Sequence, residues 1–251
     1  MLKNGFVRLV DSMPAINLDA AIVQAARVSY AGGTTSSRSD RGLIRYLMRH
    51  WHTTPFEMVE FKFHIKMPIF IARQHMRHRT ASVNELSGRY SEMPEEFFSP
   101  ETYRVQSKTN KQSSEGTLEL TLERNPDEVS RDAFRVYRDL LDSGCCRELA
   151  RCHLPLSTFT EFYWKIDLHN LMHYLRLRME AGAQEEIRVY ANEIFNIVRD
   201  LAPLTMEAFV DFRLNAITLS GPEIEAFRNG TKLDSPGEQR EFENKMKLLG
   251  K

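Results

Sequence analysis

The alternation of apolar and polar residues along the chain predicts a small number of strands. Phe6–Val10 is a short, mostly apolar run that predicts a first strand. Over Glu57–Lys66, apolar side chains alternate with charged or polar ones, which is the period of a half-buried strand. Ser157–Ile166 is rich in Thr, Phe, Tyr and Trp, and it predicts a second core strand.

Most of the remaining chain has apolar residues at helical spacing. The predicted helices are Leu18–Tyr30, Asp40–His50, Pro68–Arg77, Glu128–Ser143, Leu168–Ala181, Glu185–Leu201 and Thr205–Leu214. Asn17 is the expected cap of the first helix, Pro68 suits a first helical turn, and Gly144 suits the position after a helix end. His52–Pro55, before the long strand, is a predicted turn.

Three stretches lack a regular pattern. Ala31–Ser39 is a Gly/Thr/Ser loop. Gln106–Gly116 is rich in Ser, Lys, Asn and Gln, and it is predicted to be an exposed, mobile loop within a polar insertion near residues 104–127. The charged tail from Asp234 predicts either a loose helix or a disordered end.

The order of these elements predicts an α+β fold. We expect a single domain over residues 1–217, with a small, mainly antiparallel sheet packed by several helices. A C-terminal extension at residues 218–251 is expected to be flexible. The chain shows no internal repeat and no βαβ rhythm, and the absence of a G-x-G-x-x-G sequence excludes a Rossmann unit.

Composition narrows the class of protein. The 251 residues include 34 basic and 34 acidic side chains, so a chain-wide electrostatic attraction to nucleic acid or to an anionic membrane is not expected. Because no apolar run approaches the length of a membrane span and no signal sequence opens the chain, a cytoplasmic location is expected. The clustered Cys145, Cys146 and Cys152 argue against a disulfide framework and are expected to be buried or half-buried thiols.

One short run concentrates chemically active side chains. Arg77–Tyr90 contains three arginines, a histidine, a glutamate and two serines. Guanidinium groups are flat, permanently charged forks that suit phosphate and carboxylate, so the arginines alone are consistent with a phosphate site or with a solvated basic edge. The mixture of Asn84, Glu85, Ser87 and Arg89 favours the site, because such side chains bind ribose hydroxyls, phosphate oxygens and base edges. The sequence therefore predicts a nucleotide pocket.

The same run resembles a family signature. Arg77–Tyr90 fits the motif R-H-R-x-x-S-x-N-E-x-S-x-R-Y of flavin-dependent thymidylate synthases at every specified position. His52–Glu57 is similar to the H-x-T-P-F-E turn of this family, and Asn170–Arg178 is similar to its S-L-M-x-F-L-x-L-R helix. The resemblance covers residues 6–214, with gaps around 106–126.

The resemblance implies a specific reaction. Family members convert dUMP to dTMP by reductive methylation, with methylenetetrahydrofolate as carbon donor, FAD as hydride carrier and NADPH as reductant, and without an enzyme cysteine nucleophile. It also implies a homotetramer with active sites shared between subunits, whose partners are dUMP, folate and NADPH, with neither nucleic acid nor membrane.

The resemblance further implies two sets of site residues. The dUMP site would be made by Gln74, His75, Met76, Arg77, Glu85, Leu86, Ser87, Gly88, Arg89, Arg151 and Arg178. The FAD site would be made by His52, Thr54, Arg77, His78, Arg79, Glu85, Asp167, Leu168, His169 and His173. Gln74 and Arg77 would reach the dUMP from another subunit, and Arg89 and Arg151 would meet its phosphate.

Arg178 is the catalytic residue that the resemblance implies. A fixed positive charge against the uracil ring favours the N3-deprotonated pyrimidine, whose C5 is a better nucleophile. Ser87 would be a binding hydroxyl and not a nucleophile. Many family members have asparagine at the positions of Asp167 and His173, so this chain departs from the pattern there.

Other interpretations remain open at this point. Arg73–Arg89 could form a patch that contacts RNA or DNA, the chain could be a flavin-free scaffold, or it could be a different flavoenzyme that acts on a pyrimidine nucleotide. His169 and His173 are four residues apart, which suits two metal ligands on a helix. No glutamate follows His169 and no third ligand is visible, so no metal site is expected.

Overall fold

The computed structural model describes residues 1–29, 40–108 and 112–250. The chain forms two compact units, Met1–Phe209 and Val210–Lys251, and each is described by itself. The predicted loop Ala31–Ser39, and Tyr30 at the end of the first predicted helix, lie outside the described residues. The expected division after residue 217 stays a prediction.

The first unit is built on a four-stranded antiparallel sheet. Its strands, in spatial order, are β1 (Phe6–Met13), β2 (Glu60–Pro68), β6 (Phe159–Asp167) and β3 (Ser82–Glu85). The three predicted strands are confirmed, with ends that differ by a few residues, and so is the α+β class with a small antiparallel sheet. β3 was not predicted, because its four residues are polar or exposed and pair only along the sheet edge.

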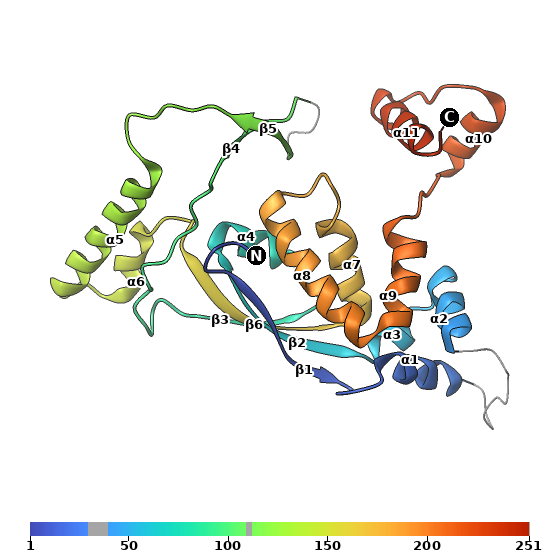
Figure 1. The fold of residues 1–251 in the computed structure, drawn as a ribbon, viewed down its shortest axis with the longest axis horizontal. Helices are drawn as coiled ribbons and strands as arrows, with labels where there is room; N and C mark the ends of the chain where they lie inside the picture. Colours follow the sequence, from blue (N-terminus) through green and yellow to red (C-terminus); the bar gives the residue numbers. More distant parts are fainter. Residues whose placement is uncertain (30–39, 109–111, 251) are drawn as a thin grey trace. The chain divides into compact units, whose positions relative to one another are not determined.

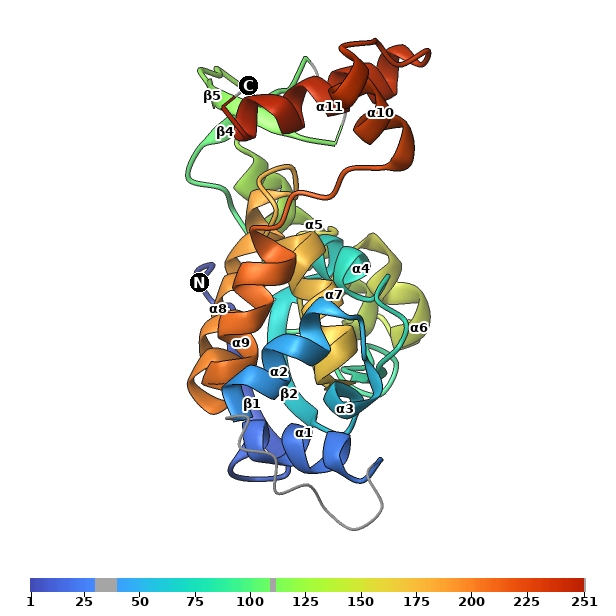
Figure 2. The ribbon, with the colours of Figure 1, turned by 90° about the vertical axis from the view of Figure 1, so that its right-hand side faces the viewer.

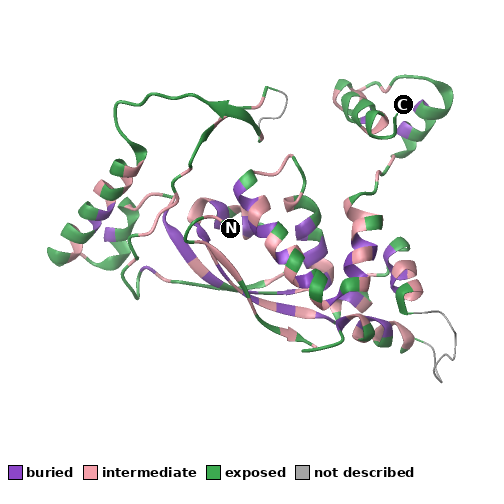
Figure 3. Ribbon diagram, viewed as in Figure 1, coloured by how far each residue is buried: buried purple, intermediate pink, exposed green. Residues whose placement is uncertain are grey.

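The two central strands separate an apolar face from a polar face. Alternate side chains of β2 and β6 are almost completely buried: Phe61, Phe63, Ile65, Phe162, Trp164 and Ile166. Three helices cover this face: α4 (Ile69–His75), α7 (Leu168–Arg178) and α8 (Glu185–Leu201) (Figure 1). Figure 3 shows that the buried positions of α7 and α8 lie toward the sheet. Each large side chain buried in this way contributes about 1.5–3 kcal/mol to stability.

A group of short helices packs beside one end of the sheet. It consists of α1 (Leu18–Arg27), α2 (Asp40–Arg49), α3 (Thr54–Glu57) and α9 (Pro203–Phe209), which contact one another (Figure 2). Where a turn was predicted at His52–Pro55, the chain already enters α3 at Thr54. Asn17 occupies the cap position of α1, but its backbone is left-handed and its side chain accepts no capping hydrogen bond, so the expected side-chain cap is absent.

The segment between β3 and β6 contains elements that lie outside the four-stranded sheet. Its elements are β4 (Tyr103–Gln106), β5 (Ser114–Leu118), α5 (Pro126–Asp142), α6 (Arg147–Ala150) and a 3-10 turn at Arg151–His153. The predicted exposure of Gln106–Gly116 is confirmed for most of its described residues, but the two ends of this segment are not irregular, because they belong to β4 and β5, which pair as antiparallel strands on either side of residues 109–111, which are not described. Gly144 follows α5 with φ +86°, as expected for a residue after a helix end.

The cysteines are less buried than predicted. All three are free thiols, and only Cys145 is half-buried, against the cluster of Phe134, Tyr137 and Ala150. Cys146 and Cys152 are exposed, because the chain around them runs along the outside of this cluster in short turns and not through a long amphipathic helix.

The second unit contains a π-helical turn (Val210–Leu214), α10 (Gly221–Asn229) and α11 (Pro236–Leu248). Of the two alternatives for the tail, the helix is the one observed. The buried Glu223 carboxylate joins α10 to α11, because it accepts hydrogen bonds from Lys245 Nζ at 2.7 and 2.9 Å. This partner, together with the Ser220 backbone, lowers the pKa of Glu223. Among the described residues, no helix is long and apolar enough to cross a membrane.

One tertiary contact generates a stability prediction. The Asp19 carboxylate of α1 accepts hydrogen bonds from the backbone N–H groups of Leu204 (2.9 Å) and Thr205 (3.0 Å), in the first turn of α9. Asp19→Ala should lower the free energy of unfolding by about 1–2 kcal/mol, because these N–H groups lose their acceptor. Urea unfolding measures the change. Asp132→Ala, which removes exposed ion pairs with Arg124 and Arg135, is the control and should cost less than about 0.5 kcal/mol. Equal midpoints for the two variants would contradict the capping role.

Candidate functional site

The arginine-rich run begins where α4 ends. α4 stops at His75, two residues earlier than predicted, so Arg77 lies beyond the helix and does not share a helical face with Arg73. Two turn hydrogen bonds continue the chain, from Arg77 N to Gln74 O (3.3 Å) and from His78 N to His75 O (3.2 Å). The run then crosses to β3 at the edge of the sheet. Residues 77–80 are therefore held between a helix end and an edge strand.

These residues line an open pocket of about 570 Å³. Its lining is Arg77, His78, Arg79, Thr80, Ile166, Asn170, His173, Leu177 and Arg178. Arg178, the last residue of α7, comes from a segment 100 positions further along the chain than His78. The sequence prediction had included five of these nine residues and missed Thr80, Ile166, Asn170 and Leu177. Asn170 lies inside the matched helix segment, so its place there was the available signal.

Arg178 is fixed by two hydrogen bonds. Its Nε–H donates to His78 Nε2 at 3.0 Å, and its Nη2 donates to the Gln74 carbonyl oxygen at 3.3 Å. Because His78 Nε2 accepts, the geometry assigns a neutral imidazole with its proton on Nδ1. Burial, with contributions from Arg178 and His173, lowers the pKa of His78 to about 4. At neutral pH His78 is therefore uncharged, and the positive charge of this pair resides on Arg178.

A buried polar pair lies directly behind this contact. His75 is 0% exposed, its Nδ1 lies 3.0 Å from the Tyr174 hydroxyl, and its ring packs edge-on against Trp164 at 4.3 Å between centroids. Burial, with contributions from His78 and Arg178, lowers the pKa of His75 to about 3. The His75 side chain thus faces the core, and its implied contact with dUMP would have to come from the backbone. The same holds for the fully buried Leu168 and its implied FAD contact.

The second half of the run forms a separate group of site residues. The Glu85 carboxylate accepts a hydrogen bond from the Thr160 hydroxyl at 2.6 Å, and Ser87 Oγ accepts one from Arg89 N at 3.3 Å. Gly88 is buried, and a Cβ added there would lie 3.1 Å from Arg151 Cδ. A glycine at this position therefore lets the Arg151 side chain pass close to the backbone beside Arg89. Arg151 therefore lies against the residue that precedes Arg89, the other arginine with an implied phosphate role, although 62 positions separate the two arginines in the sequence.

Two of the implied site residues are not brought to these two groups within one chain. His52 and Thr54 line a different pocket, beside α1 and α2. Asp167 caps α7, since its carboxylate accepts hydrogen bonds from Asn170 N (2.9 Å) and Asn170 Nδ2 (2.7 Å). This cap gives a structural role to the carboxylate of Asp167, at a position where many family members have asparagine. His173 is the other position at which the chain departs from the family pattern. Its ring lies 5.9 Å from the His78 ring.

The arginines of the site lack acidic neighbours. In residues 1–29, 40–108 and 112–250, no carboxylate oxygen lies within 4.0 Å of Arg77, Arg79, Arg89, Arg151 or Arg178. By contrast, Arg104, Arg124 and Arg138 are ion-paired with glutamate or aspartate. Guanidinium groups that the chain leaves without carboxylates, around a pocket with no acidic lining residue, are suited to an anionic ligand.

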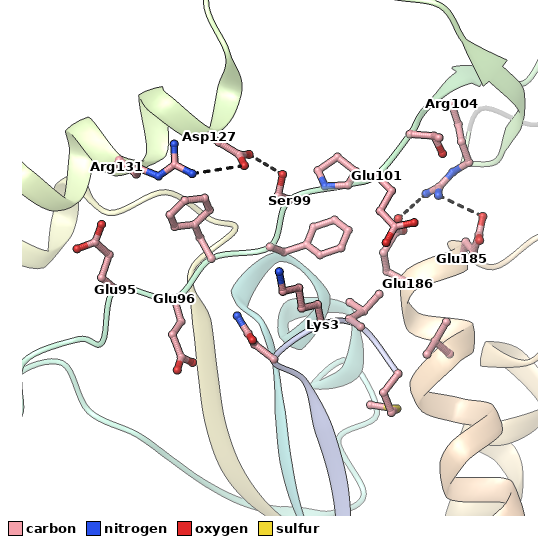
Figure 4. A pocket seen from close by; sticks show the side chains of 18 residues that line it. Lys3, Glu95, Glu96, Ser99, Glu101, Arg104, Asp127, Arg131, Glu185 and Glu186 are labelled. Atoms are coloured by element: carbon pink, nitrogen blue, oxygen red, sulfur yellow. Dashed lines mark hydrogen bonds and ion pairs between the residues drawn. The ribbon is translucent and has the colours of Figure 1, made fainter.

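A second polar pocket, of about 670 Å³, has the opposite charge balance (Figure 4). Its charged lining residues are Lys3, Arg104 and Arg131 against Glu95, Glu96, Glu101, Asp127, Glu185 and Glu186. Arg104 bridges Glu185 (3.1 Å) and Glu186 (2.6 Å), while Asp127 accepts a hydrogen bond from Ser99 at 2.5 Å. Six carboxylates against three cations disfavour a phosphate, so we assign the anionic ligand to the arginine-lined pocket.

Metal binding has no support in the part of the chain that the structure describes. No group of three or more His, Cys, Asp or Glu side chains there is arranged to hold a metal ion. His169 and His173 share one helix, α7, and His173 is directed toward the arginine-lined pocket.

Comparisons with known proteins show which family this chain resembles. The family model described as thymidylate synthase complementing protein (Thy1) matches residues 8–204. A flavin-dependent thymidylate synthase from Thermus thermophilus is 56% identical over 232 residues, which cover 91% of this chain and 84% of that protein. One from Dictyostelium discoideum is 50% identical over 258 residues, covering 98% and 85%. The solved structure of a UMP/dUMP methylase, PolB from Streptomyces cacaoi bound with 5-Br dUMP, superposes with a TM-score of 0.72 at 36% identity, covering 84% and 96%.

The buried His75 generates a prediction about pH. An unfolded histidine titrates near pH 6.5, whereas folded His75 stays neutral down to about pH 3. Between these values the unfolded chain binds a proton that the folded chain excludes, so stability is lost as the pH falls. For one group the slope approaches about 1.4 kcal/mol per pH unit. Urea unfolding at pH 7, 6 and 5 should show a shallower loss in His75→Phe than in the wild type. Identical slopes in the wild type and in His75→Phe would contradict the prediction.

Proposed function

The chain belongs to the Thy1 family of thymidylate synthase complementing proteins, and on that basis we propose that it is a flavin-dependent thymidylate synthase that methylates dUMP to dTMP. The observation on which the proposal rests is the set of arginines without carboxylate partners at the end of α4, at the end of α7 and after β3. Such a set suits a substrate and a cofactor that both contain phosphate.

We propose that the dUMP site is composite. One group, Gln74, Arg77 and Arg178, lies at the meeting point of α4 and α7. The other group, the loop at residues 85–89 together with Arg151, follows β3. The residues of the second group do not line the pocket of the first within one chain, which supports an arrangement in which different subunits contribute the two groups. A homotetramer with shared sites would join them.

The residues of the arginine-lined pocket fit an FAD. Arg77 and Arg79 are exposed forks without carboxylate partners and would hold the pyrophosphate, while the neutral His78 and the half-exposed Asn170 offer uncharged hydrogen-bonding groups. The chemistry that FAD supplies when bound is hydride transfer to the new one-carbon group. In our proposal NADPH and methylenetetrahydrofolate are co-substrates that provide the electrons and the carbon.

Arg178 would act on the pyrimidine. Its guanidinium cannot lose its proton, and the hydrogen bonds to His78 Nε2 and Gln74 O fix it in place. A fixed cation beside the uracil stabilises the N3-deprotonated form, which places negative charge at C5 and makes this carbon the nucleophile toward the one-carbon donor. The proposal therefore requires no enzyme nucleophile. Ser87 Oγ, which accepts the Arg89 N–H, has a binding role.

Two alternatives are separable by experiment. A nucleic-acid-binding patch would give steeply salt-dependent affinity for long polynucleotides, with no flavin. The second alternative concerns the substrate. The solved relative is named as a UMP/dUMP methylase, and these two nucleotides differ only at the ribose 2′ position, so UMP should be tested beside dUMP.

The first prediction of the proposal is spectroscopic. Purified protein should show a flavin absorbance spectrum, or acquire it with added FAD, and titration with dUMP should shift that spectrum because both ligands occupy one composite site. With NADPH and methylenetetrahydrofolate present, dTMP should form. A colourless protein that takes up no FAD would overturn the proposal, and a flavoprotein that makes no dTMP would favour another flavoenzyme of pyrimidine nucleotides.

The second prediction concerns Arg178. Arg178→Ala should keep its flavin but form dTMP about 100–1000-fold more slowly, because the charge acts on the pyrimidine and not on the cofactor. Arg176→Ala is the matched control, since Arg176 is exposed two residues earlier on the same helix and does not line the pocket. Flavin absorbance measures cofactor content, and product formation at saturating dUMP measures turnover. Near-normal turnover of Arg178→Ala would remove Arg178 from the mechanism.

A further inference from the structure

A buried tyrosine lies one helical turn before Arg178. Tyr174 and Arg178 are four residues apart on α7, so their side chains leave the same face of the helix. The Tyr174 hydroxyl lies 3.0 Å from His75 Nδ1, and the Tyr174 ring packs edge-on against the His78 ring, with 4.9 Å between centroids. One side chain of α7 therefore contacts two histidines, one at the end of α4 and one three residues beyond it.

The orientation of the His75 ring depends on this contact. The ring is fully buried, and its Nε2 has no hydrogen-bond partner within residues 1–29, 40–108 and 112–250. The bond between Nδ1 and Tyr174 is thus the hydrogen bond that sets which way the ring faces. A buried polar atom without a partner destabilises a fold, and apolar side chains at both positions would avoid that penalty. The pair is therefore better explained by the arrangement that it fixes than by the stability that it adds.

This arrangement includes the two acceptors of the Arg178 guanidinium. Nη2 donates to the carbonyl oxygen of Gln74, which is the residue before His75. Nε donates to His78, whose ring the Tyr174 ring supports. The position of both acceptors relative to α7 therefore depends on the contacts of Tyr174. A displacement of about 1 Å in a group that acts on a substrate is enough to slow a reaction strongly.

We propose that Tyr174 is a positioning residue for Arg178. Its hydroxyl holds His75 and its ring supports His78, so that the guanidinium keeps one orientation toward the pyrimidine. Tyr174 is fully buried and does not line the arginine-lined pocket, so its effect on the reaction passes through Arg178. The inference rests on the proposed function, in which the charge of Arg178 acts on the uracil ring.

Tyr174→Phe tests the hydroxyl, because it keeps the ring. The variant should keep its flavin, and turnover should fall about tenfold with a smaller change in KM for dUMP, since the charge is misplaced and not removed. Tyr190→Phe is the matched control. It removes the hydroxyl of another buried tyrosine, on α8, for which no hydrogen-bond partner exists among the described residues, and it should leave turnover unchanged.

A double variant separates positioning from stability. Tyr174→Phe leaves His75 without its hydrogen-bond partner, which lowers Tm. His75→Phe combined with Tyr174→Phe leaves no polar side chain at either position, so its Tm should lie above that of Tyr174→Phe, while turnover stays low. Recovery of turnover together with Tm would show that Tyr174 acts on stability alone, and it would overturn the positioning role.

A cycle with Arg178→Ala tests whether Tyr174 acts through the arginine. In the Arg178→Ala background, Tyr174→Phe should have no further effect on turnover, because the group that it positions is gone. An equal fold-loss of turnover in both backgrounds would overturn the proposal.

The pH profile gives a readout that a purely structural role would not change. The titratable and charged groups around this contact are Arg77, Arg79, His75, His78, His173 and Tyr190. Burial lowers the pKa of His75 to about 3 and that of His78 to about 4, and it raises the pKa of Tyr174 and of Tyr190. These four groups therefore stay neutral between pH 7 and pH 9, and His173 is present in every variant.

Over this range, uracil N3 loses its proton increasingly without the help of a cation. The deficit of Tyr174→Phe relative to the wild type should therefore shrink as the pH rises, as it should in Arg178→Ala. A deficit that is constant with pH would overturn the positioning role. A wild type that forms dTMP, with equal turnover in Tyr174→Phe, overturns that role alone. A wild type that forms no dTMP overturns the proposed function.

Discussion

The antiparallel pairing of β2 with β6 is the constraint on which the site depends. Each strand has nine residues, and each is followed at once by a helix that folds back over the same apolar face: α4 after Pro68 and α7 after Asp167. Because the strands run in opposite directions, the two helices start from opposite ends of a sheet about 30 Å long. Their lengths, about 10 and 16 Å, bring their C-terminal ends together. Arg178 therefore meets His78 and the Gln74 carbonyl.

This arrangement also explains why the site is cationic. The C-terminal end of a helix has partial negative charge, and arginine and histidine in the last turn compensate it. Two such ends converge here, with Arg73 in the last turn of α4 and Arg178 in that of α7. On the core side of these helix ends lies the His75–Tyr174 pair, and burial keeps His75 neutral. The charged guanidinium groups therefore lie on the outer side, where an anion can reach them.

Much of the fold could be predicted from apolar spacing, because burial on one face imposes a period on the sequence. β2, β6 and α8 follow from this rule, and α8 has the predicted ends. The rule fails where no face is buried. The exposed β3 and β5 have no apolar alternation, and their pairing depends on hydrogen bonds that leave little trace in residue type. Exposure of Cys146 and Cys152 was missed for a related reason, since α6 and the 3-10 turn at Arg151–His153 are too short for apolar spacing to show which of their side chains are exposed.

The residues of the site were predictable from a motif, but their geometry was not. Spacing alone does not indicate that His78 accepts a hydrogen bond from Arg178, 100 positions away, or that Arg151 lies over Gly88. Both contacts are consequences of the sheet register and of short connections. The pocket lined by His52 and Thr54 likewise depends on how α2 ends, which the periodicity of that helix does not determine.

The edge position of β3 has a consequence for motion. β3 contributes only four residues to the sheet, all exposed, and they pair with β6 alone. Segments with few buried contacts open at a lower free energy than the core around them. Amide protons of residues 82–91 should therefore exchange with solvent through local opening, whereas those of β2 should exchange only on global unfolding. The loop with Ser87 and Arg89 can then detach and re-form without disturbing α4 and α7, so one half of the site is adjustable and the other is rigid.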